Sequence, residues 1–121
     1  MVGCLEPKSW EARDDGWTER TRQTVELTAD HSDAGSLVEV AAFRPYPNLD
    51  YRFVGCGDEG FADLDVLVYG DASRLVGRDG SSGRDPEFTL RGDVSQRLSV
   101  RLFAAALTEP SGEAGVLVLA K

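Results

Sequence analysis

Residues 51–69 read YRFVGCGDEGFADLDVLVY, and this stretch describes two strands with a short connection between them. Tyr51 and Phe53 alternate with Arg52, which is the period of a half-buried strand. The run that ends at Tyr69 is almost continuously apolar and rich in β-branched residues, as a second strand would be. Between them, three glycines and two acidic residues are typical of a tight, solvated connection. The stretch therefore predicts a β-rich fold.

Short strands continue on both sides of this stretch, and turn residues separate each one from the next. The sequence predicts them at residues 22–28, 37–43, 74–78, 88–90, 96–107 and 114–120. In the second of these, Val38, Val40 and Ala42 are expected to face the same side. The connections are too short for the helical crossovers that a parallel sheet requires. The pattern therefore indicates an all-β protein built as an antiparallel β-sandwich.

The first part of the chain is the least regular. Residues 1–21 are expected to form an N-terminal arm or short helix ahead of a sandwich domain at 22–121. Ser9 is a candidate helix cap, with Trp10 and Trp17 a heptad apart on one side. Large aromatic side chains mostly serve burial, so the arm is expected to pin one or both tryptophans onto the domain. The alternative is that the arm docks onto a partner.

Composition limits the classes of function that the chain can perform. At 121 residues it has the size of one globular domain. The formal net charge of −8 disfavours nucleic-acid and anionic-membrane partners, because both carry negative charge. No apolar run approaches the roughly 20 residues that a membrane-spanning helix needs. The protein is therefore expected to bind no nucleic acid and not to be transmembrane.

The two cysteines, Cys4 and Cys56, lie far apart in the sequence. Their spacing matches no zinc site and no C-x-x-C motif. Either both are free, with Cys56 buried as a small apolar residue, or they bridge the arm to the core. Residues 2–4 also resemble the end of a bacterial lipoprotein cleavage site, although the long apolar segment that normally precedes it is missing.

The order of segments resembles the bacterial pre-peptidase C-terminal domain. The matching segments run over most of the chain: YRFVGC at 51–56, DLDVLVY at 63–69, LVGRD at 75–79 and RLSVR at 97–101. The resemblance implies a jelly-roll-like β-sandwich that is non-catalytic, bacterial and sometimes calcium-binding. It also implies an extracytoplasmic location, whether secreted, periplasmic or surface-anchored.

The acidic connection and the strand after it form the candidate metal site. Asp63 and Asp65 are two residues apart in a strand, so both side chains lean to the same face. Asp58 and Glu59 lie just before them and could fold back. Calcium takes six to eight oxygen ligands, and a glycine-rich loop supplies carbonyls freely. The alternative is that Asp63 caps the turn while the other carboxylates are solvated.

Two further features have weaker readings. His31 stands beside acidic and hydroxyl residues, but neighbours in one turn point apart, so no catalytic triad is expected there. An enzyme would require His31, Asp63 and Asp65 to converge. A series of arginines forms either a basic strip on a wet sheet face, able to hold an anionic partner, or cross-strand pairs with acidic residues: Arg74, Arg78, Arg84, Arg91, Arg97 and Arg101.

The expected function is therefore binding rather than catalysis. The chain shows no spacing typical of a nucleophile with its base or of a metal hydrolase. We expect a binding or targeting module for a protein or polysaccharide partner, possessing no catalytic residue and with calcium as its candidate ion. The alternative is a structural subunit of a larger assembly that docks through its N-terminal arm. A binder is expected to be monomeric, whereas a subunit is expected to self-associate.

Overall fold

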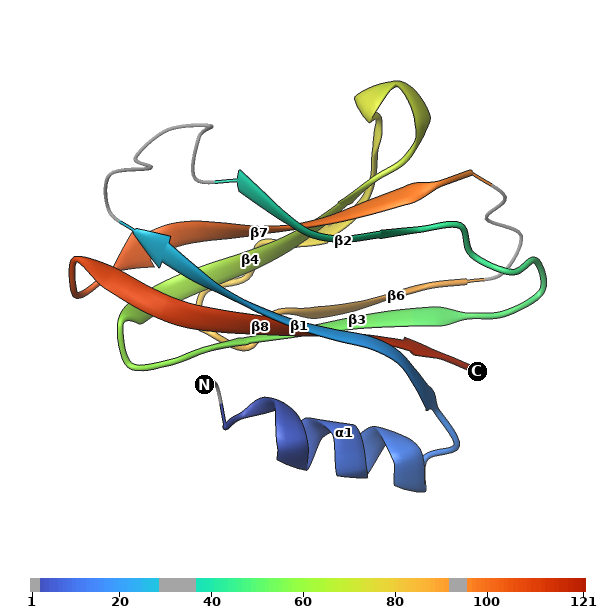
Figure 1. Ribbon diagram of the computed structural model, residues 1–121, viewed down its shortest axis with the longest axis horizontal. Coiled ribbons are helices and arrows are strands. Elements are labelled where there is room, and N and C mark those ends of the chain that lie inside the picture. Colours follow the sequence, from blue (N-terminus) through green and yellow to red (C-terminus); the bar gives the residue numbers. More distant parts are fainter. Residues whose placement is uncertain (1–2, 29–36, 92–95) are drawn as a thin grey trace.

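The computed structural model describes residues 3–28, 37–91 and 96–121 and shows two antiparallel sheets packed face to face (Figure 1). The sheets have the strand orders β1-β8-β3-β6 and β2-β7-β4-β5, which is the arrangement of an eight-stranded jelly roll. The antiparallel sandwich predicted from the sequence is therefore confirmed. The elements are α1 (Leu5–Asp14), β1 (Thr18–Thr28), β2 (Leu37–Phe43), β3 (Tyr51–Gly57), β4 (Phe61–Tyr69), the 3₁₀ turn η2 (Asp71–Ser73), β5 (Leu75–Asp79), β6 (Glu87–Leu90), β7 (Leu98–Leu107) and β8 (Ser111–Ala120).

The main core fills the space between the two sheets. On β7, the fully buried Leu98, Val100 and Leu102 alternate with residues that face outward. From the opposite sheet, Phe53 enters the same core and stacks on Phe88, with ring centres 5.1 Å apart. Period-two alternation in the sequence therefore corresponds to one buried and one outward face, as an antiparallel sandwich requires.

The two strands of residues 51–69 lie in opposite sheets, as β3 and β4. The connection between them is held by Asp58, whose Oδ1 accepts a hydrogen bond from the Gly60 amide at 2.8 Å. Its Oδ2 accepts one from the Glu113 amide at 2.9 Å. A Cβ on Gly60 would lie 2.6 Å from the Ser111 carbonyl oxygen, so this close approach requires glycine.

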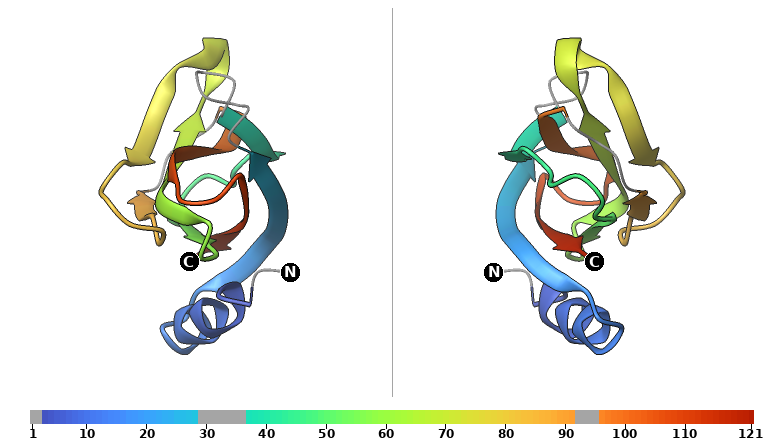
Figure 2. Two further views of the ribbon diagram at one scale, coloured as in Figure 1. Left: turned by 90° about the vertical axis from the view of Figure 1, so that its left-hand side faces the viewer. Right: turned by 90° about the vertical axis from the view of Figure 1, so that its right-hand side faces the viewer.

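Helix α1 covers the outer face of the β1-β8-β3-β6 sheet, which we call the covered sheet (Figure 2). A second, smaller core forms there from residues of the arm and of β3 and β8: Leu5, Ala12, Trp17, Val54, Cys56, Leu117 and Leu119. Cys4 and Cys56 form a disulfide with a Cα–Cα distance of 6.3 Å. The bridge therefore ties the arm to the core, and it leaves no Cys4 thiol for a lipid.

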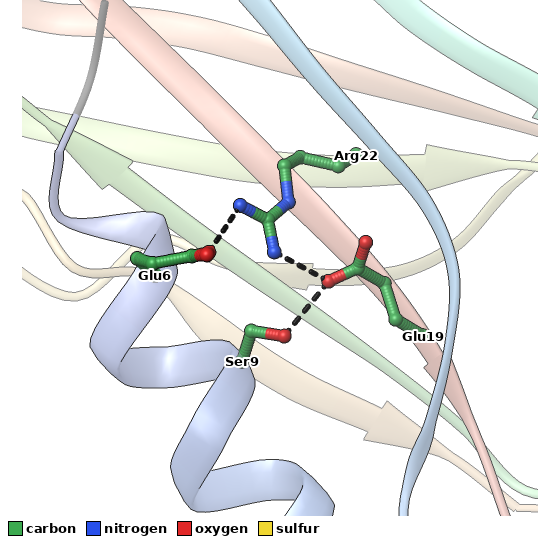
Figure 3. A network of polar contacts seen from close by, with 4 residues as sticks. All are labelled: Glu6, Ser9, Glu19 and Arg22. Atoms are coloured by element: carbon green, nitrogen blue, oxygen red, sulfur yellow. Dashed lines mark hydrogen bonds and ion pairs between the residues drawn. The ribbon is translucent and has the colours of Figure 1, made fainter.

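A polar network also holds α1 against the sheet (Figure 3). The hydroxyl of Ser9, a buried residue, donates to the Glu19 carboxylate at 2.8 Å. Arg22 bridges Glu19 and Glu6, and it reaches Glu19 at 2.8 Å. The hydrogen bond from Arg22 lowers the pKa of Glu19 below its usual value. Because Glu19 and Arg22 belong to β1, the network joins the helix to the edge of the covered sheet.

Three details differ from the sequence predictions. β1 begins at Thr18 rather than at residue 22, so the expected boundary between arm and domain falls inside this strand. Ser9 lies within α1 instead of capping it, because the helix begins after Cys4. Ala42 faces outward, unlike Val38 and Val40, because a bulge in β2 shifts the alternation before Ala41.

Candidate binding face

The outer face of the β2-β7-β4-β5 sheet, which we call the open face, lies on the opposite side of the molecule from α1 (Figures 1 and 2). On β4, the fully buried Leu64, Val66 and Val68 alternate with half-buried residues that point outward. Within the described ranges, no helix packs on this side of the sandwich. The open face is therefore the exposed counterpart of the covered sheet.

The strand register sets the rows of the open face, because directly opposite residues of antiparallel strands lie on the same side. In one row, Leu67 pairs with Arg101 on one neighbour and with Arg78 on the other. In the next row, Tyr69 pairs with Ser99 and Leu75, and the Leu75 side chain is 44% exposed. The centre of the face is thus a leucine and a tyrosine flanked by arginines.

Contacts among the side chains fix the position of Arg101. Its guanidinium lies over the Tyr69 ring, 4.4 Å from the ring centre. Its Nε donates to the Ser99 hydroxyl at 3.1 Å, and Ser99 in turn donates to the Glu39 carboxylate. These contacts place the charge of Arg101 on the open face.

Other arginines near this face have no carboxylate bound to them. Among the described residues, no ion pair within 4 Å forms with Arg74, Arg78, Arg97 or Arg101. Arg97 directly precedes β7 and is exposed, and the alternation of the strand, extended by one residue, puts it on the same side as Ser99 and Arg101. The prediction of cross-strand pairing holds for Arg91, which contacts Asp50 at 3.2 Å. The arginines of the open face instead resemble the basic strip that was the other reading of the sequence.

The acidic end of the open face is the pair Asp63 and Asp65 at the start of β4. Each has one carboxylate oxygen, Oδ1, that is enclosed and accepts no hydrogen bond. Burial, followed by the neighbouring charge of Asp63, raises the pKa of Asp65 to about 6. The positive charge of Arg78 acts in the opposite direction and offsets only part of this increase in pKa. This end of the face therefore carries negative charge that the fold does not neutralise.

The structure does not gather the four predicted calcium ligands into one site. Asp58 uses both carboxylate oxygens for the turn, and the Glu59 side chain is exposed. No group of three or more acidic, histidine or cysteine side chains in the described part of the chain could hold a metal ion. The alternative, in which Asp63 caps the turn, is wrong in its residue, because Asp58 accepts the hydrogen bonds of the turn and Asp63 Oδ1 accepts none. His31 lies outside the described residues.

A cleft lies between α1 and the covered sheet, away from the open face, with a volume of about 350 Å³. Arg52 lies here, with its guanidinium 4.4 Å from the centre of the Trp17 ring and its Nε 3.3 Å from a Glu87 oxygen. Sequence reasoning missed this contact, because Arg52 and Trp17 belong to elements that meet only in the fold. The charged residues that line the cleft are Lys8, Glu11, Asp14, Asp15, Arg52 and Glu87.

Comparison of the sequence with protein-family models and with curated proteins finds no match. Among solved structures, the fold is similar to the pre-peptidase C-terminal domain of a Bacillus anthracis collagenase, with a TM-score of 0.58 and 10% identity over 81% of this chain and 87% of that one. It is also similar to PliG of Aeromonas hydrophila, a periplasmic inhibitor of g-type lysozyme, with a TM-score of 0.54 and 7% identity over 87% of this chain and 86% of that one. At these identities the similarity shows the fold alone. Within the described residues, no helix is long and apolar enough to cross a membrane.

Proposed function

We propose that this protein is a non-catalytic β-sandwich module that acts by binding a protein or polysaccharide through its open face. The observation that carries the proposal is the contrast between the two outer faces. One is sealed by α1 and a disulfide, whereas the other presents Leu67, Tyr69 and a set of arginines that form no ion pair with any described residue. Tyrosine and arginine are the residue types enriched in binding hot spots. The jelly-roll likeness to a pre-peptidase C-terminal domain supports kinship with that family of accessory domains.

The proposed location is extracytoplasmic. Structural disulfides persist in oxidising compartments and are rare in the reducing cytosol. The Cys4–Cys56 bridge joins the arm to the small core beneath α1, where Cys56 is fully buried, as a structural disulfide does. The periplasmic lysozyme inhibitor that shares the fold supports the same location.

Binding to an immobilised panel of polysaccharides and extracellular matrix proteins tests the proposed face. Leu67→Ser and Arg78→Ser, each on the open face, are expected to weaken binding by about 10-fold or more, as hot-spot changes do. Trp10→Ser on α1 is the matched control, because Trp10 is 59% exposed on the opposite side of the molecule. Binding that responds only to Trp10→Ser would contradict the open-face proposal.

That last outcome would support the alternative function, a structural subunit that docks through its arm. The exposed Trp10 is the observation that favours it, since its ring lies outside the small core beneath the helix. The rest of the arm is already bound to its own domain through Leu5, Ala12 and Trp17. Docking would therefore use the outer side of α1 rather than a free arm.

Calcium binding stays a prediction, and it now concerns Asp63 and Asp65. Two carboxylates completed by water would hold calcium with a Kd of the order of 1 mM, the weak end of extracellular sites. Calcium at about that concentration adds roughly 0.4 kcal/mol of stability, so we expect a melting shift of only a few degrees or less. Differential scanning fluorimetry with calcium, and with a chelator, measures it. A larger shift that survives Asp65→Asn would place the ion elsewhere.

A further inference from the structure

We propose that the open face pairs with the open face of a second copy of this chain, related to the first by a two-fold axis. The inference rests on the proposed function, because it names a second copy of this chain as the protein partner of the same surface. It replaces the expectation that a binding module of this kind is monomeric. Both halves of the required complementarity lie on one chain: an acidic end and a basic end of the same sheet. For any other partner, only one half can be described.

The charge of the open face is polarised along β4. Its outward residues are, in order, Asp63, Asp65, Leu67 and Tyr69. The acidic pair therefore occupies the start of the strand. The basic residues of the neighbouring strands lie level with Leu67 or beyond it, because Arg78 and Arg101 are both paired with Leu67, and Ser99, which follows Arg97 by two residues, is paired with Tyr69. Glu39 of β2 is paired with Arg101 and offsets part of this positive charge. The net charge of the face thus changes from negative to positive along the direction of the strand.

A two-fold axis near Leu67 exploits this polarity twice. In such an isologous interface, both copies use the same surface, and every contact occurs twice with the roles of the two copies exchanged. The acidic end of each copy would then lie over the basic end of the other. Leu67 and Tyr69 would meet their counterparts near the axis. Opposite charges therefore meet in both halves of the interface. An alignment with the two β4 strands parallel is disfavoured, because like charges would then face each other.

The unneutralised charge of the single chain fits this pairing. The Asp63–Asp65 pair has no hydrogen-bond donor at either Oδ1 atom, and burial together with the neighbouring Asp63 raises the pKa of Asp65 despite the opposing charge of Arg78. Arg78 and Arg97 are exposed and have no ion pair among the described residues. In the proposed dimer, the arginines of one copy supply the positive charge that the Asp63–Asp65 pair of the other copy lacks.

Sedimentation equilibrium of the whole chain tests the pairing. At about 100 µM protein and about 50 mM salt we expect a dimer, with a Kd that rises at least about 10-fold at about 500 mM salt, because salt screens the exposed charges. Two variants shift the net charge of the face to one sign, with Arg101 retained in the acidic variant and Glu39 retained in the basic one. Asp63→Lys with Asp65→Lys makes it basic, and Arg78→Glu with Arg97→Glu makes it acidic. Each alone is expected to be monomeric.

The decisive sample is the equimolar mixture of the two variants, in which a heterodimer is expected because a face with net positive charge meets a face with net negative charge. Formation of the dimer in the mixture also shows that both variants are folded. Arg13→Glu, an exposed change on α1, is the matched control and is expected to leave the dimer intact.

A wild-type monomer under these conditions overturns the inference, and so does a dimer that persists in both variants, since it would use another surface. The proposed function is tested separately. A monomer that binds a panel member through Leu67 and Arg78 retains the proposed function and loses only the self-pairing.

Discussion

At the scale of single residues, the pair Asp63 and Asp65 predicts a pH dependence of stability. Burial and the charge of Asp63 raise the pKa of Asp65 to about 6 in the folded protein, against about 3.9 in an unfolded chain. Between these values the folded state binds more protons, so this group's contribution to stability is fully present below pH 4 and is lost as pH rises through 6. Asp65→Asn is expected to raise the free energy of unfolding by about 1 kcal/mol at pH 7 after allowance for solvent screening.

Urea denaturation at pH 7 and pH 4 measures this effect. The gain from Asp65→Asn is expected to vanish at pH 4, where the native carboxyl is already protonated. The other charged groups that act on Asp65 are Arg78 and Asp79, and they are unchanged in the variant. Glu109→Gln, at an exposed carboxylate, is the control. An equal gain at both pH values would show that the amide stabilises for a reason unrelated to charge.

The positions of the candidate site residues were predictable from the sequence only where they depend on residues nearby in the chain. The period of a strand placed Asp63 and Asp65 on one face, and the structure shows them acting on each other. The role of Asp58 depends on the Glu113 amide, which is far away in the sequence. Arg101 lies over Tyr69 because β7 pairs with β4, and no sequence pattern states which strands pair.

At the scale of elements, the docking of α1 onto β8 depends on Gly115. A Cβ at this position would lie 2.6 Å from Leu5 Cδ1 and 3.2 Å from the Gln23 carbonyl oxygen, which belongs to a paired strand and cannot move away. Gly115→Ala is therefore expected to displace Leu5 and to lower stability by about 1–3 kcal/mol, as overpacking does.

Denaturation monitored by tryptophan fluorescence measures this loss, because Trp17 is buried in the same small core whereas the other tryptophan, Trp10, is already exposed in the folded state. Gly3→Ala is the matched control, since no atom lies within 4 Å of a Cβ there. If Gly115→Ala is as stable as the parent chain, the helix does not pack as closely as the structure shows.

The burial of the covered sheet on both faces is also visible in the sequence pattern of β8. Residues 114–120 form an almost unbroken apolar run, and β8 is buried on both faces there. The alternating pattern of β4 instead indicates one outward face. The run indicates that something covers the strand, but it does not identify the cover. Helix α1 was hard to assign because it buries only Leu5, Ser9 and Ala12, and one of these is polar.

At the scale of the whole molecule, the disulfide joins positions separated by 52 residues. In the chain-entropy view, closing a loop of this size stabilises by up to about 4 kcal/mol. Cys4→Ser with Cys56→Ser is expected to lose a large part of that, measured as a fall in the free energy of unfolding. The variant should not respond to a reductant, whereas the parent chain should. If a reductant shifts both by the same amount, its action does not pass through this bond.

The overall architecture was predictable because strand period and turn residues are local signals that recur along the chain. The pairing of the cysteines was not. A disulfide needs its two Cα atoms within about 7 Å, and that distance is a property of the folded arm rather than of the spacing in sequence.

The bridge between Cys4 and Cys56 also decides how the domain would carry tension between Gly3 and Lys121. With the bridge intact, the load enters β3 at Cys56, which is paired with Gly115, and leaves through the far end of β8, where Ala120 is paired with Tyr51. The ladder between them is then sheared, with its hydrogen bonds loaded together. Without the bridge, the load enters at Thr18, directly opposite Ala120, and opens the β1–β8 ladder one bond at a time. Reduction should therefore turn a mechanically strong domain into a weak one, and single-molecule force spectroscopy would record the change as a fall in rupture force.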